Sequence, residues 1–170
     1  MSKKTRTEFH RPIEVEHLPP GGYSEYLTAE EAELAALAVR LKLPRFFGLR
    51  ARLKVERLRA GGAMVSGELT ADVAQTCVVT LEDFRSTLTF PVARIFLPPK
   101  EIPDDDSEEA DADPVIEGRI DLGELVTETL SLNLDPYPTK PGAAFEEPRP
   151  ESESSSSAFA VLEQLKSAGG

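Results

Sequence analysis

A long alternation of apolar and polar residues constrains the fold of this chain more than any other feature of its sequence. Over residues 49–56 every second residue is apolar and its neighbours are charged, in the order Leu49, Arg50, Ala51, Arg52, Leu53, Lys54, Val55, Glu56. The same period of two continues over residues 65–81 and again over residues 84–96. Because successive side chains of a strand point to opposite faces, this pattern predicts three strands, each with one apolar face. Turns at Gly61–Gly62 and Glu82–Asp83 join them into an antiparallel meander, which strand twist makes strongly twisted or partly barrel-like.

Two segments outside this alternation carry helix signals. In the first, Thr28 stands at the cap position with Glu31 three residues later, a capping box that predicts a helix start. In the second, Asp121 and Glu124 form the same pattern. Apolar residues follow both caps at helical spacing: Leu34, Leu37, Ala38 and Leu41, then Leu122, Leu125, Val126 and Leu130. The expected fold class is therefore α+β, an antiparallel meander with two packed helices.

The length of 170 residues suits one domain with appendages. We expect a single domain over residues 1–145 that contains a disordered acidic loop at 99–118. Residues 100–117 include nine acids and one base, and such a segment buries too little apolar surface to offset its ordering entropy. Residues 146–170 are expected to form a flexible tail. Near its end Phe159, Leu162 and Leu165 recur every three residues, which predicts a short helix that docks on the domain or on a partner.

Charge is distributed unevenly along the chain. The net charge of −11 argues against a protein that coats nucleic acid nonspecifically, but residues 40–59 hold eight bases and one acid. One interpretation is a solubilising surface that the acidic loop partly neutralises. The other is a face that follows RNA phosphates, through a set of bases that we take as candidate site residues: Arg50, Arg52, Lys54, Arg57 and Arg59.

The sequence offers little for catalysis or metal binding. Its single cysteine, Cys77, forms no internal disulfide and favours a reducing compartment. With only His10 and His17 as imidazole donors, no zinc set or cysteine nucleophile with a base is apparent, so we expect Cys77 to be a buried structural residue on the inward strand face. No signal peptide or membrane-length apolar run follows Met1, which favours a cytoplasmic protein. We also expect no cofactor.

Two stretches, residues 67–82 (GELTADVAQTCVVTLE) and 120–132 (IDLGELVTETLSL), followed by Asp135-Pro136-Tyr137-Pro138, resemble the YceD-like family. Its members are also called large ribosomal RNA subunit accumulation proteins, and the likeness spans roughly Phe9 to Phe145. Many members carry Cys-x-x-Cys where this chain has Ala74-Gln75-Thr76-Cys77, so a shared zinc or dithiol role is not expected here. The form Cys-Val-Val-Thr-Leu-Glu resembles the alphaproteobacterial branch.

The resemblance implies a role in accumulation of 23S ribosomal RNA and in large-subunit assembly, with no catalytic residues to carry over. The leading hypothesis is a monomeric, non-enzymatic ribosome biogenesis factor that binds 23S rRNA, or an immature particle, through the five bases. The alternative is a protein-interaction adaptor that captures a basic ribosomal protein with its acidic loop and tail. An enzyme that uses Cys77 is the weakest hypothesis.

Overall fold

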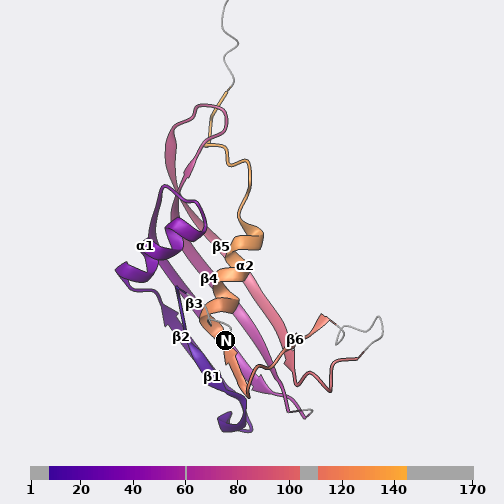
Figure 1. Cartoon of the computed structure of the whole chain (residues 1–170). Helices are drawn as coiled ribbons and strands as arrows, with labels where there is room; N and C mark the ends of the chain where they lie inside the picture. Colours follow the sequence, from indigo (N-terminus) through magenta and orange to yellow (C-terminus); the bar gives the residue numbers. More distant parts are fainter. Residues whose placement is uncertain (1–7, 60, 104–110, 145–170) are drawn as a thin grey trace, which may run out of the picture.

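Three long consecutive strands form the centre of the structure, a computed structural model (Figure 1). They are β3 (Arg45–Arg57), β4 (Ala63–Thr76) and β5 (Asp83–Leu97), and each pairs antiparallel with the next. The order β2-β3-β4-β5-β6 is completed by β2 (Tyr23–Thr28), antiparallel to β3, and by β6 (Asp113–Pro114), parallel to β5. The predicted meander is confirmed, and the sheet is open at β2 and β6 rather than closed into a barrel. The structure describes residues 8–59, 61–103 and 111–144.

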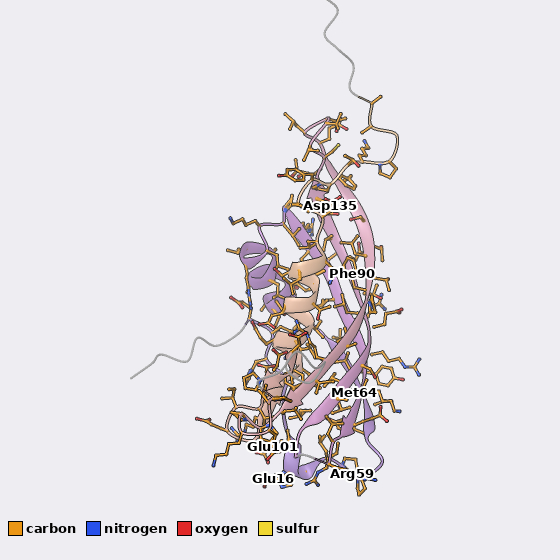
Figure 2. The ribbon with its side chains drawn as sticks, turned by 90° about the vertical axis from the view of Figure 1, so that its right-hand side faces the viewer. Glu16, Arg59, Met64, Phe90, Glu101 and Asp135 are labelled. Carbon is orange, nitrogen blue, oxygen red and sulfur yellow. The ribbon has the colours of Figure 1, made fainter. Side chains whose placement is uncertain are left out.

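A small second sheet and two helices complete the fold, which confirms the α+β class. The short strands β1 (Pro12–Glu14) and β7 (Arg119–Asp121) pair antiparallel, and a 3-10 turn, η1 (Val15–His17), follows β1. The helices are α1 (Glu31–Arg40), which contacts β3, and α2 (Leu122–Asn133), which contacts β4 and β5. Both helices lie on the same side of the large sheet (Figures 1 and 2).

Burial follows the alternation read from the sequence. In β3 the apolar residues Leu49, Leu53 and Val55 are buried, whereas Arg50 and Lys54 between them are exposed. The same side of β4 contributes further buried residues, namely Val65, Leu69, Ala71 and Val73. One face of the sheet therefore forms the core beneath the helices, and its opposite face carries the polar side chains.

Of the two predicted N-cap residues, the structure confirms one. Asp121 caps α2 as expected, because its Oδ1 accepts the backbone N–H groups of Gly123 (3.0 Å) and Glu124 (3.3 Å). Carboxylate acceptance at this position satisfies N–H groups that have no partner inside the helix.

The predicted cap of α1 is wrong by two residues. Thr28 is the last residue of β2 and pairs with Arg50, so the chain is still extended there. The helix begins only at Glu31, with Glu30 as N-cap residue, and the backbone N–H of Glu30 donates to Glu33 Oε2 at 2.8 Å. Sheet pairing of Thr28 therefore overrides a local capping signal.

The alternation beyond β4 also ends earlier than predicted. β4 stops at Thr76, and residues 77–82 turn back toward β5 through a bond from the N–H of Cys77 to the carbonyl of Glu82 (2.9 Å). Leu81, expected on the inward face, has φ of 58° and is 78% exposed. A period of two alone does not distinguish a strand from a turn whose residues happen to alternate.

The acidic loop predicted at 99–118 stays a prediction, because residues 104–110 lie outside the described part. The described residues that follow pair with the sheet. Asp113 and Pro114 form β6 beside Phe96 and Leu97, and the N–H of Val115 donates to the Leu97 carbonyl at 2.9 Å. Ala112 and Val115 are buried, at 8% exposure each, so two apolar side chains anchor this acidic stretch to the sheet. The predicted tail, residues 146–170, lies outside the described residues.

Two neighbouring substitutions test this anchoring. Val115→Ala removes two buried methyl groups and should lower the free energy of unfolding by about 1–3 kcal/mol. Ile116→Ala, at a side chain that is 54% exposed, should change it by less than about 0.5 kcal/mol. Urea unfolding followed by circular dichroism measures both. Equal, negligible effects would mean that the segment contributes nothing to the folded core.

Candidate nucleic-acid interface

The side of the large sheet that faces away from the helices is the candidate interface, and we call it the open face. Strand register defines its members, because residues that pair across strands point to the same side. Arg50, Arg52 and Lys54 of β3 pair with Thr28, Tyr26 and Ser24 of β2. Across the other edge of β3 the same three bases pair with Thr70, Glu68 and Ser66 of β4.

Only three of the five predicted site residues share this face. Arg50, Arg52 and Lys54 are all exposed and alternate along β3, which separates neighbouring members by about 7 Å. Arg57 has the opposite parity, on the side of the buried Val55, and is exposed only because it ends the strand. Arg59 is exposed in the turn after β3. The five bases therefore do not form a single surface.

The three bases on the open face differ in what surrounds them. Lys54 Nζ forms an ion pair with Glu56 Oε1 at 2.7 Å, and an exposed pair of this kind contributes little to stability. The guanidinium of Arg52 lies 5.7 Å from the centre of the Tyr26 ring, which is within the range of a cation–π contact. Arg50 has no ion pair or side-chain hydrogen bond with any residue in the described ranges.

A cluster of cations around an aromatic ring extends the open face toward the start of β3. A register shift between Phe46 and Gly48 turns Phe47 outward, so that Phe46 is 6% exposed and Phe47 is 36% exposed. The guanidinium carbons of Arg85 and Arg45 lie 4.3 and 5.1 Å from the centre of the Phe47 ring.

One acid is held within this cluster. Arg85 Nε donates to Asp72 Oδ1 at 2.8 Å, and a second contact joins the same two side chains. These bonds lower the pKa of Asp72, to which the positive charge of nearby Arg50 also contributes. Asp72 therefore stays ionised and offsets part of the charge of Arg85.

Sequence reasoning missed Tyr26, Phe47 and Arg85 as members of this surface. Arg85 was detectable, because it stands on the polar side of the alternation over residues 84–96. Phe47 was not, since its outward position depends on the bulge. Tyr26 gains its place only because β2 pairs with β3 in one particular register.

Other bases of the cationic block over residues 40–59 have structural partners. Arg40, in the last turn of α1, binds Glu124 of α2 at 2.6 Å and Glu8 at 2.9 Å. It therefore joins the two helices on the covered side of the sheet. The open face is left with five bases, Arg45, Arg50, Arg52, Lys54 and Arg85, against four acids, Glu56, Glu68, Asp72 and Asp83. The open face thus has a small excess of positive charge, whereas the net charge of the whole chain is −11.

Cys77 is buried as predicted, but it lies in a turn rather than on a strand. Its sulfur accepts the backbone N–H groups of Lys140 (3.3 Å) and Thr80 (3.5 Å). The N–H of Lys140 is the largest cause that lowers the pKa of the Cys77 thiol to about 7, and Thr80 adds to it. The thiol thus holds residues 138–140 against the β4–β5 turn, where Val78 also donates its N–H to the Pro138 carbonyl.

No cluster of three or more candidate metal ligands occurs in the described part of the chain. None of its helices has the length and apolar character needed to cross a membrane.

The lowered pKa predicts how Cys77 contributes to stability as pH changes. The folded chain releases the thiol proton near pH 7, whereas an unfolded cysteine keeps it to about pH 8.5. Stability from this group should therefore rise between these values and be lost as pH falls through 7. The measurement is the difference in unfolding free energy between the native chain and Cys77→Ala at pH 6 and pH 9. A difference that is equal at both pH values would contradict the prediction.

Comparison with known proteins gives one family. The family model described as "Large ribosomal RNA subunit accumulation protein YceD" matches residues 65–166, more than half of the chain. The matched range begins in β4, includes Cys77, Arg85 and α2, and extends beyond Ala144, the last described residue. The matched range excludes β3 and therefore the row Arg50, Arg52 and Lys54. No curated protein and no solved structure matches the chain.

Proposed function

The chain belongs to the YceD family of large ribosomal RNA subunit accumulation proteins, and we propose that it acts by binding 23S rRNA, or an immature large-subunit particle, through the open face. The family name implies a role in accumulation of large-subunit rRNA. The observation that carries the binding proposal is the row Arg50, Arg52 and Lys54 on a sheet face that neither α1 nor α2 covers.

The chemistry of the open face supports contact with an RNA backbone. Alternate residues of a strand stand about 7 Å apart, a spacing of the same order as that of consecutive phosphates along an RNA strand. Arg50 offers a guanidinium that has no internal ion pair in the described structure, so binding a phosphate breaks no existing bond. Threonine hydroxyls beside it, Thr28 and Thr70, are additional donors for phosphate or sugar oxygens.

The exposed aromatic rings add a second mode of contact. Tyr26 is 67% exposed next to Arg52, and Phe47 is 36% exposed with the guanidinium groups of Arg45 and Arg85 near its ring. Aromatic rings and arginine planes both stack on unpaired bases. These rings add to the face that follows RNA phosphates, which was expected from the sequence.

The small charge excess of the open face fits an oriented contact rather than strong general affinity. Because the open face carries four acids beside its five bases, and the whole chain has a net charge of −11, the chain should bind RNA only where several phosphates match the row. We propose accordingly a monomeric binding factor of the cytoplasm with no catalytic step.

A protein-interaction adaptor is the second candidate. The described flanks of the acidic segment expose Glu101, Asp111 and Glu117, and β6 holds this segment at one edge of the sheet. Such a position suits capture of a basic ribosomal protein without any RNA contact. In this case the open face is only a solvated surface.

Charge reversal on the open face separates these candidates. The triple variant Arg50→Glu, Arg52→Glu and Lys54→Glu should abolish specific binding to 23S fragments in a gel-shift titration. For the native chain, the logarithm of affinity should fall with the logarithm of salt concentration by about 0.7–0.9 for each phosphate contact, and the variant should lose this dependence.

A matched control carries the same change in charge away from the open face. Lys100→Glu, Arg119→Glu and Lys140→Glu replace exposed bases outside the sheet face, two of which form surface ion pairs with Glu14 and Glu82. This control should keep most of the affinity. Equal loss in both triple variants would show that only total charge matters, and unchanged affinity in the first would favour the adaptor.

A further inference from the structure

An apolar groove separates α1 from the start of β3 and has no partner in the described structure. It has a volume of about 640 Å³, and its apolar walls include Leu34, Ala38, Val39, Leu43, Phe46 and Phe47. Val39 is 81% exposed although it lines the same groove as buried Leu34 and Phe46. An exposed aliphatic side chain that continues an apolar groove indicates a surface that another element covers.

The last described residues lie beside the β4–β5 turn, at one end of the sheet (Figure 1). A second hollow, of about 460 Å³, shares Leu43 and Pro44 with the groove and reaches Pro136 and Pro138. The chain from Pro138 is held in place, because the Lys140 N–H binds the Cys77 sulfur and the Ala143 N–H binds the Lys140 carbonyl. Residues 145–170 therefore follow a segment that is fixed on the folded domain.

We propose that the C-terminal segment Phe159–Lys166 of this chain docks in this groove as a short helix. Phe159, Leu162 and Leu165 lie three residues apart, and this spacing places them on one side of a helix. The match to the family model continues to residue 166 and so includes this segment together with the folded strands. A segment that belongs to the same family unit as the sheet is a suitable occupant for a groove on it.

Chain length and charge both permit this docking. The fourteen residues 145–158 reach about 46 Å when extended, and a random-coil chain of this length has an average end-to-end distance of about 20 Å. Attachment through such a linker gives the segment an effective concentration in the millimolar range at the groove, so a weak contact is enough. The groove carries Glu31 and Arg45, and the segment carries Glu163 and Lys166, so each side has one acid and one base.

The test uses the complete chain with a nitroxide label at Ser167→Cys. Cys77 is buried, and the unsubstituted chain treated with the same reagent controls for labelling there. The label should broaden the backbone amide signals of α1 and of residues 43–47, and chemical reduction of the nitroxide should restore them. Unbroadened signals in these two segments would overturn the proposal.

Two matched variants show whether the groove itself is the docking surface. Val39 and Leu132 are each the penultimate residue of a helix and are 81% and 75% exposed, but only Val39 lines the groove. Val39→Lys should remove the broadening, whereas Leu132→Lys should leave it in place. Loss in both variants, or in neither, would contradict docking in the groove.

A mixing experiment identifies the source of the segment. Labelled chain without isotope is mixed with isotope-enriched chain without label, so that only contacts between copies produce broadening. Docking within one chain predicts no broadening in the mixture. Broadening of α1 signals in the mixture would assign the groove to a second copy and overturn the proposal. These readouts involve no RNA and do not depend on the proposed function.

Discussion

Pairing of three strands of 13, 14 and 15 residues in one register is the constraint on which the rest of this structure depends. A slip of one residue would move every apolar side chain of a strand to the open face and every base to the core. Gly67 of β4 contributes to this precision where it pairs with Leu53 of β3. It has φ of 154°, and a Cβ atom there would lie 2.1 Å from the carbonyl oxygen of Arg52. Only glycine allows the two backbones to meet at this point.

The same register serves the core and the candidate interface at once. Leu49, Ala51 and Leu53 are buried and each is followed by an outward base. The packing that holds Leu53 beneath the helices therefore also orients Arg52 and Lys54 toward solvent. A rigid sheet thereby presents its cations with little loss of backbone entropy when a ligand binds. Other cations among residues 40–59 have structural roles. Arg40 of α1, for example, forms an ion pair with Glu124 of α2.

The connections at the ends of the sheet depend on contacts between residues far apart in the chain. Val115 joins the end of an acidic segment to the core, and the Cys77 sulfur holds Lys140 against the β4–β5 turn. Neither contact has a local sequence signal. Nine acids predict disorder by composition, yet two small apolar side chains, Ala112 and Val115, are enough to anchor one end of the segment.

The sequence by itself determined the long strands, the sides on which their residues lie, and the Asp121 cap of α2. All three follow from periods and caps that operate over a few neighbouring residues. Only the tertiary structure decided which cations share a surface. Tyr26 stands beside Arg52 because β2 pairs with β3, Phe47 faces outward because of a bulge, and Thr28 is drawn into β2 instead of capping α1. These outcomes depend on pairing and packing between distant segments, and local side-chain patterns do not encode the partner that each segment meets.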